Sequence, residues 1–235
     1  MKILAMDSSA LTASVAVCED EKLLGEYTLN NGNTHSENLL PMTESLLKFL
    51  DLSVSDIDAF AVSIGPGSFT GIRIGVSTVK GLAFGSDKPC AGVSTLEALA
   101  YNLALTDGLI CPVMNARRDQ VYTALFRAES GKLTRLMPDS AISLSELREI
   151  LLGYGEPVAF VGDGYFLTAK LDIPQKRETP DRLRHQSAYS VALAALAKLR
   201  AGEATSDREL APVYLRPCQA ERERAERLAQ ESNQT

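Results

Sequence analysis

The sequence predicts an α/β protein built from two copies of one βββαβα unit. Segments with strand-like and helix-like hydrophobic patterns follow the same order in the two halves of the 235-residue chain, and a glycine-rich loop follows a strand in each half. With 45% hydrophobic residues, the chain is long enough to bury one large core or two small ones.

The first copy begins with three short strands, predicted near residues 2–7, 13–18 and 22–29. Segment 35–50 carries an apolar stripe and is expected to be a helix, with Thr34 and Glu37 forming a capping box at its start. A strand near 58–64, a glycine-rich loop and a helix near 70–85 complete the unit.

The second copy begins near residue 109, with strands predicted at 109–114, 120–127 and 132–136. A helix capped by Ser143 with Glu146 follows, and after it the apolar strand 158–161. This duplicated order is typical of the actin-like (ASKHA, ribonuclease H-like) fold of actin, hexokinase and Hsp70, in which nucleotides usually lie in the cleft between the halves.

Two further helices are predicted. One links the halves and begins at a capping box of Ser94 with Glu97, and the other is an alanine-rich helix at 187–200. We expect two subdomains and a tail, with these bounds: 1–105 for the N-terminal subdomain, 106–218 for the C-terminal subdomain, and 219–235 for a charged, solvated tail.

Composition narrows the class of protein. No stretch approaches the roughly 20 apolar residues that span a bilayer, and Asp7 interrupts the N-terminus before a signal-peptide core could form, so a cytoplasmic protein is expected. The four cysteines lie far apart and form no zinc or disulfide pattern. A net charge of −6 disfavours broad binding of nucleic acid, so any role with RNA should be indirect or shared with a partner.

The loop from Gly65 to Gly71 has two interpretations. A strand that ends in a glycine-rich loop and opens a helix can cradle an anion, because free amides and the helix dipole point into the loop. The alternative is a tight turn that needs glycine, and the loop matches neither Walker A nor GxGxxG. Acids at equivalent strand ends could hold a metal-nucleotide, although they also form ordinary turns. The candidate nucleotide-binding residues are Asp7, Ser8, Gly65, Gly67, Gly162 and Asp163.

The helix after this loop contains four glycines, each of which costs about 1 kcal/mol of helix propensity relative to alanine. They share one face of the helix with three other residues, and the seven are Gly71, Ile74, Gly75, Thr78, Gly81, Leu82 and Gly85. A face without bulk allows another backbone to approach closely, either from within the protein or from a partner. Internal packing and partner binding both remain open on this evidence.

The sequence gives little support for a metal site or for a nucleophilic active site. The two histidines, His35 and His185, lie in separate halves, and neither has a second ligand at helical spacing. His35 is expected to stabilise the entry to a helix. No Ser/His/Asp or Cys/His arrangement is indicated.

The segment Ile64-Gly65-Pro66-Gly67-Ser68-Phe69-Thr70-Gly71-Ile72-Arg73-Ile74-Gly75 resembles the signature of the TsaB (YeaZ) family. Four weaker matches occur in the order of that family: Ile3 to Ser9, His35 to Pro41, Gly92 to Ala100, and Tyr214 to Pro217. The resemblance extends to about residue 218.

The resemblance implies a noncatalytic paralogue of the metal-dependent subunit TsaD. Thr95 and Leu99 stand where the catalytic paralogue has its metal-binding histidines, so this chain itself should bind no metal or other cofactor. TsaD and the ATPase TsaE would be its partners and would use the metal ion and ATP, and a homodimer could form when the chain is alone. The chain would contact tRNA only as part of the complex. This complex transfers a threonylcarbamoyl group from threonylcarbamoyl-AMP to the adenosine beside the anticodon.

The resemblance also implies a partner surface on the two N-terminal helices. This surface would use Leu39 and Leu46 of the first helix and the seven-residue glycine face of the second. The competing hypothesis is an actin-like ATP hydrolase or small-molecule kinase that uses Asp7, Asp163 and the glycine-rich loop.

Overall fold

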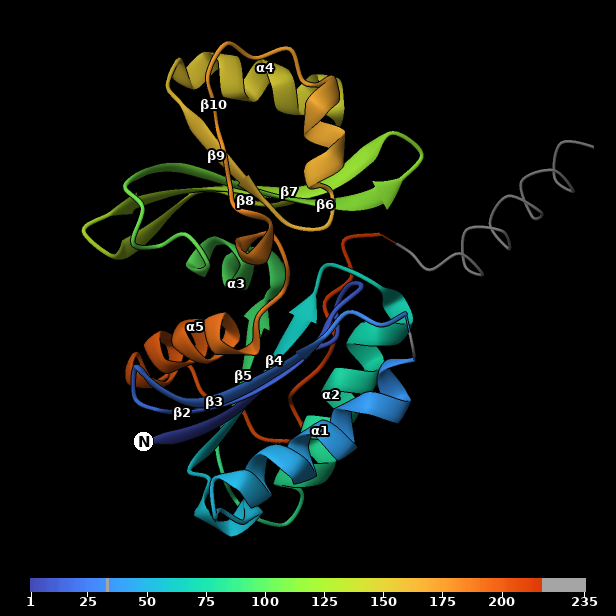
Figure 1. Ribbon diagram of the computed structural model, residues 1–235, viewed down its shortest axis with the longest axis vertical. Coiled ribbons are helices and arrows are strands. Elements are labelled where there is room, and N and C mark those ends of the chain that lie inside the picture. The colour runs from blue at the N-terminus through green and yellow to red at the C-terminus, as the bar shows by residue number, and fades with distance from the viewer. Residues whose placement is uncertain (33, 217–235) are drawn as a thin grey trace, which may run out of the picture.

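The computed structural model describes residues 1–32 and 34–216, which form two five-stranded sheets one above the other along the long axis (Figure 1). The elements of the first half are β1 (Lys2–Asp7), β2 (Ala13–Glu19), β3 (Lys22–Leu29), α1 (His35–Phe49), β4 (Ala59–Gly65), α2 (Phe69–Ala83), β5 (Cys90–Ser94) and α3 (Thr95–Tyr101). Those of the second half are β6 (Gly108–Arg117), β7 (Gln120–Glu129), β8 (Lys132–Ser143), α4 (Leu144–Tyr154), β9 (Val158–Val161), β10 (Lys176–Arg177) and α5 (Ala188–Arg200). Short 3₁₀ helices are η1 (Val54–Asp56), η2 (Tyr165–Lys170) and η3 (Asp181–Leu183).

The two sheets have the same topology. The first runs β3-β2-β1-β4-β5 and the second runs β8-β7-β6-β9-β10. In each, the first three strands form an antiparallel meander, and the fourth and fifth are parallel to the first. This repeated order confirms the predicted duplicated actin-like fold. The second copy lacks its last α-helix and has the 3₁₀ helix η2 after β9.

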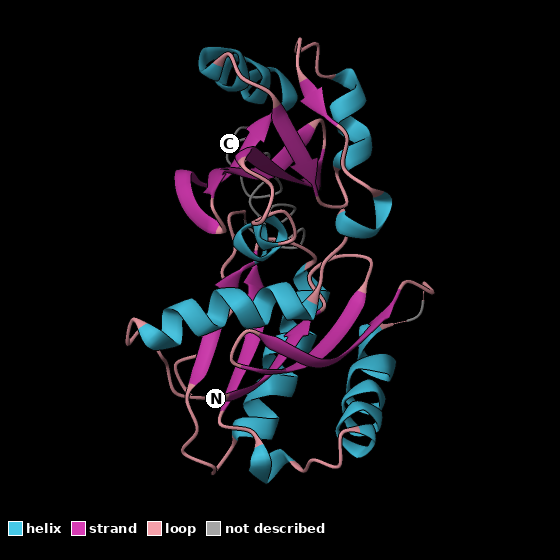
Figure 2. Cartoon of the chain, turned by 60° about the vertical axis from the view of Figure 1, so that its left-hand side comes forward, coloured by secondary structure: helices cyan, strands magenta, loops and turns pink. Residues whose placement is uncertain are grey.

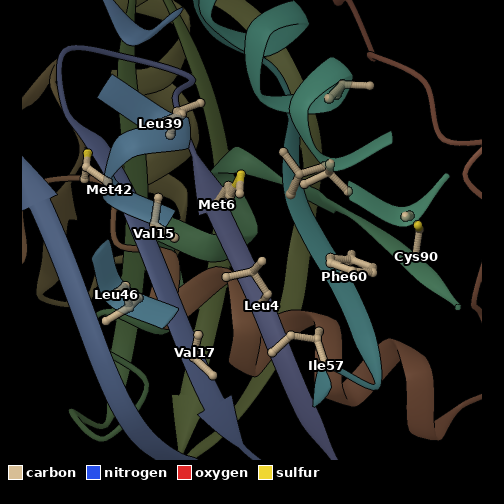
Figure 3. Close-up of a cluster of buried hydrophobic side chains, with 14 of the residues drawn as sticks. Leu4, Met6, Val15, Val17, Leu39, Met42, Leu46, Ile57, Phe60 and Cys90 are labelled. Carbon is tan, nitrogen blue, oxygen red and sulfur yellow. The ribbon is translucent and has the colours of Figure 1, made fainter. Parts of the chain in front are cut away.

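The first sheet is covered on both faces, because successive side chains of a strand point to opposite sides. Leu4 and Met6 of β1 point toward α1 and α2, together with Phe60 of β4 (Figure 3). Ile3 and Ala5 point to the other face. Each of these five side chains is fully buried.

Helix α5 covers the second face of the first sheet (Figures 1 and 2). Alanines on both sides of this contact let the helix approach closely: Ala16, Ala59 and Ala61 from the strands, and Ala188, Ala192 and Ala195 from α5. The helix lies within 106–218, the range predicted for the C-terminal subdomain, but it packs on the sheet of the first half. The grouping of elements in space therefore does not follow their order in the sequence, because a late helix completes the core of the first half.

Several details depart from the predictions. Strand β5 was not predicted, and β8 extends to Ser143, well past the predicted end at residue 136. The capping box of Ser143 with Glu146 is confirmed, whereas Thr34 precedes α1 without any capping bond from its side chain. Within the described residues, no helix is long and apolar enough to cross a membrane. The predicted tail 219–235 lies outside the described residues.

Candidate functional site

A cleft of about 730 Å³ lies between the two halves. Its walls come from the loop after β1, the glycine-rich loop with the start of α2, the end of β6, the turn after β9 with the start of η2, and the segment 213–216 near the end of the described chain. The aromatic and charged side chains of this lining include Phe69, Arg117, Asp163, Phe166, Tyr214 and Arg216.

The glycine-rich loop forms one wall of this cleft, and its glycines are required by close backbone packing. A Cβ at Gly65 would overlap the carbonyl oxygen of Val213, and a Cβ at Gly67 would overlap the carbonyl oxygen of Ser9. Both glycines have positive φ angles, of 124° and 158°. The Ser68 amide donates to the Ser9 carbonyl at 2.7 Å, so this amide is already used inside the chain. The geometry therefore favours the tight-turn interpretation of this loop.

Asp7 lies at the end of β1 but does not line the cleft. One carboxylate oxygen accepts from the amide and the hydroxyl of Ser9, at 2.8 and 2.6 Å, and the other accepts from the Ser63 hydroxyl at 2.5 Å. Burial raises the pKa of Asp7, while the hydrogen bonds from Ser63 and Ser9 oppose that shift. Asp7 therefore holds together the ends of β1 and β4, as a turn-forming acid does.

Asp163, its counterpart after β9, lines the cleft. Burial raises the pKa of this carboxyl to about 6, and backbone hydrogen bonds from Asn115 and from residues 163 and 164 oppose the shift. Its Oδ1 atom is buried without a hydrogen-bond partner among the described residues. Of the six candidate nucleotide-binding residues, the structure brings Gly67 and Asp163 to the cleft and leaves the other four in its supporting packing.

A second groove, of about 560 Å³, lies between α1 and α2. Nine residues line it: Ser36, Leu39, Leu40, Phe69, Thr70, Arg73, Ile74, Ser77 and Thr78. Leu40 is 53% exposed, while Leu39 at the base of the groove is 1% exposed. The two helices thus present an open surface that contains an exposed leucine.

Two residues of the predicted partner surface, Gly71 and Gly75, pack closely against the chain itself. A Cβ at Gly71 would overlap the carbonyl oxygen of Ser8, and a Cβ at Gly75 would lie 2.6 Å from the Ser8 hydroxyl oxygen. These glycines let α2 pass directly over the end of β1. Leu46 is also buried, at 2% exposure, and supports α1 from the core.

The other residues of the predicted partner surface on α2 and in the turn after it are less buried than Gly71 and Gly75. Ile74 and Thr78 line the groove and are half-buried, and Leu82 is half-buried against the core cluster. A Cβ at Gly81 or Gly85 would meet nothing within 4 Å. Gly85 has a φ of 69° in the turn after α2, which gives it a conformational role. Neither close packing nor backbone conformation therefore accounts for the glycine at position 81.

Contacts of segment 213–216 were not predicted from the sequence. The Val213 amide donates to the Ile64 carbonyl at 2.8 Å, and Arg216 Nη1 donates to the Ala116 carbonyl at 3.0 Å, so the segment crosses from the first sheet to the second. Tyr214 stacks on Phe69 with ring centroids 4.6 Å apart. The match of Tyr214 to Pro217 with a family pattern was the signal that could have drawn attention to this segment.

His35, Thr95 and Leu99 have structural contacts within the chain. His35 Nε2 lies 2.7 Å from the Ala10 carbonyl and ties the start of α1 to the loop after β1, which agrees with its predicted role at the helix entry. Thr95 and Leu99 are both buried in α3. Among residues 1–32 and 34–216, no three His, Cys, Asp or Glu side chains gather as a metal site would require.

The family model described as "TsaD: tRNA N6-adenosine threonylcarbamoyltransferase" matches residues 22–223. The "tRNA threonylcarbamoyladenosine biosynthesis protein TsaB" of Bacillus subtilis is 36% identical over 223 residues, which cover 94% of this chain and 96% of that protein. The Escherichia coli protein of the same name is 37% identical over 134 residues, 56% of this chain and 58% of that protein. The structure of YeaZ from Pseudomonas aeruginosa gives a TM-score of 0.77 at 26% identity, covering 91% of this chain and 99% of that one.

Proposed function

Because the chain belongs to the TsaB (YeaZ) family and so has a role in tRNA threonylcarbamoyladenosine biosynthesis, we propose that it acts there as the noncatalytic partner subunit of TsaD. With TsaE, the pair would transfer the threonylcarbamoyl group from threonylcarbamoyl-AMP to tRNA. The metal ion and ATP would be used by the partner subunits.

The main structural support for this proposal is the groove between α1 and α2. Its wall includes Leu40, half exposed in the isolated chain, and its α2 side is formed by short or half-buried side chains such as Ile74, Ser77 and Thr78. An exposed leucine beside a shallow groove can be covered by a helix of a partner, which buries apolar surface and brings two helices close. Gly81, one turn further along α2, adds no side chain that would hold such a helix away.

The lack of catalysis by this chain is supported by what its own residues do. Asp7 has both carboxylate oxygens bonded to serines of neighbouring strands and loops. Thr95 and Leu99, which by the family resemblance stand where TsaD has its metal-binding histidines, have buried side chains that pack within the core. These residues stabilise the fold, and none of them faces the cleft.

A second candidate is an ATP hydrolase or small-molecule kinase. Asp163 favours it, because its carboxyl lines the cleft and one of its oxygens has no hydrogen-bond partner among the residues that the structure describes. The two candidates are separated by reconstitution. TsaD, TsaE, threonylcarbamoyl-AMP and tRNA are assayed for transfer with and without the chain, and the chain alone is assayed for nucleotide turnover with magnesium. We expect transfer to require the chain and the chain alone to turn over no nucleotide. Turnover by the chain alone, abolished by Asp163→Asn, would support the second candidate.

A further inference from the structure

We propose that one edge of the cleft is an RNA-binding surface, by which this chain contributes part of the tRNA site of its complex. The surface consists of Arg73, Arg117 and Arg216 and is called the arginine edge below. The inference rests on the proposed function, since tRNA would bind across this chain and its partner together.

The three arginines come from distant parts of the sequence and lie on neighbouring elements of the fold. Arg73 Nε donates to the Tyr214 hydroxyl at 2.9 Å, and its guanidinium carbon lies 3.8 Å from the centre of the Phe69 ring. Two residues after Tyr214, Arg216 donates to the Ala116 carbonyl at 3.0 Å. Arg117 follows directly, so the arginine edge runs from the start of α2 across segment 213–216 to the end of β6.

No carboxylate of the described residues neutralises the charges of the arginine edge. In the described residues, Arg127, Arg135, Arg148, Arg184 and Arg200 each form ion pairs with carboxylates. Over the same part of the chain, no carboxylate lies within ion-pair distance of the three arginines of the edge. The described residues that line the cleft include a single acid, Asp163, which is largely buried. A local positive edge on a protein of net charge −6 is thus available for an anionic ligand.

Aromatic rings beside the arginines indicate RNA as the anion. Tyr214 is 39% exposed and Phe166, on η2, is 62% exposed, and both line the cleft. Unpaired bases of RNA stack on aromatic rings and on arginine guanidinium groups, while arginines contact the neighbouring phosphates. A tRNA loop offers both kinds of group, and the family to which the chain belongs acts in a tRNA modification pathway.

The test measures binding of tRNA to the complex of this chain with TsaD, over a series of salt concentrations. Arg117→Gln and Arg216→Gln are compared with the wild type, singly and together, after the affinity of each for TsaD has been measured. Arg73 is left unchanged, since it also lines the groove between α1 and α2. Arg200→Gln is the matched control, because it removes the same charge from the C-terminal end of α5.

Each lost phosphate contact should make the slope of log K against log salt shallower by about 0.7. At about 0.15 M salt this corresponds to roughly four-fold weaker binding for each arginine and about 15-fold for the double variant. Phe166→Ala should weaken binding by about 5- to 150-fold without changing the salt slope, since stacking is not ionic. Arg200→Gln should bind tRNA as the wild type does.

Wild-type tRNA affinity and salt slope in the double variant, with TsaD binding intact, would overturn the inference. Failure of the wild-type chain to bind TsaD would instead contradict the proposed function. In that case the isolated chain is titrated with the same tRNA at low salt. Weaker binding by the double variant than by Arg200→Gln would then still support the arginine edge, and equal binding would overturn it.

Discussion

The hydroxyl of Ser8 donates a hydrogen bond of 2.9 Å to the carbonyl of Gly71, and the carbonyl of Ser8 occupies the space that a side chain at position 71 would need. The end of β1 and the first turn of α2 are therefore in direct backbone contact. This contact fixes the helix that forms one side of both the cleft and the groove.

Gly71→Ala should destabilise the isolated chain, because the added Cβ would displace the carbonyl of Ser8 and disturb the hydrogen bond from the Ser8 hydroxyl to the carbonyl of residue 71. Overpacking of this kind costs about 1–3 kcal/mol. Gly81→Ala, in the same helix with nothing near its Cβ, should be neutral or stabilise by up to about 1 kcal/mol. Urea denaturation measures both variants. An equal change of stability in the two variants would mean that the contact with Ser8 adds no cost at position 71, and would contradict the account.

Glu26 should be a stabilising residue that no pattern in the sequence singled out. Its Oε1 accepts from the hydroxyls of Ser14 and Ser187, at 3.0 and 2.8 Å, and from the amide of Tyr189 at 3.2 Å, so β3 caps the start of α5. Glu26→Ala leaves these donors without their acceptor and should cost about 1–3 kcal/mol in free energy of unfolding. Glu21→Ala, which removes an exposed ion pair with Arg200, should change it by less than about 1 kcal/mol. A Glu26→Ala variant as stable as Glu21→Ala would contradict the capping role.

Asp163 should make the folded chain less stable as the pH rises. Its pKa is raised from 3.8 to about 6, so between these values the folded state binds more protons than the unfolded state, and stability falls with increasing pH. Asp163→Asn removes this term. The variant should therefore exceed the wild type in stability at neutral pH, by at most about 3 kcal/mol, and the difference should vanish below about pH 4. Denaturation curves at several pH values test this, and a difference independent of pH would contradict it.

The sequence predicted most of the fold because the alternating apolar residues of strands such as β1 record which side chains are buried. Strand β5 was missed because Cys90 to Ser94 is short and includes Gly92, and its position depends on pairing with β4. The glycine face of α2 was recognised, but its spacing could not show what lies against it. The neighbour of Gly71 and Gly75 is Ser8, more than 60 residues earlier in the chain. The arginine edge could not be predicted from the sequence for the same reason, because its three arginines come together only when the two halves fold.

The proposal that TsaD binds in the groove between α1 and α2 is tested most directly by measuring the affinity of TsaD for the Leu40→Arg variant. Leu40 is 53% exposed, so the substitution should leave the melting temperature of the isolated chain unchanged. Leu105→Arg is the matched control, since Leu105 is 91% exposed and does not line the groove. We predict at least about ten-fold weaker binding of TsaD by Leu40→Arg, because an arginine in an apolar interface would be buried without a partner charge, and wild-type affinity for Leu105→Arg. Wild-type affinity in a folded Leu40→Arg chain, or no binding of TsaD by the wild type, would contradict the account.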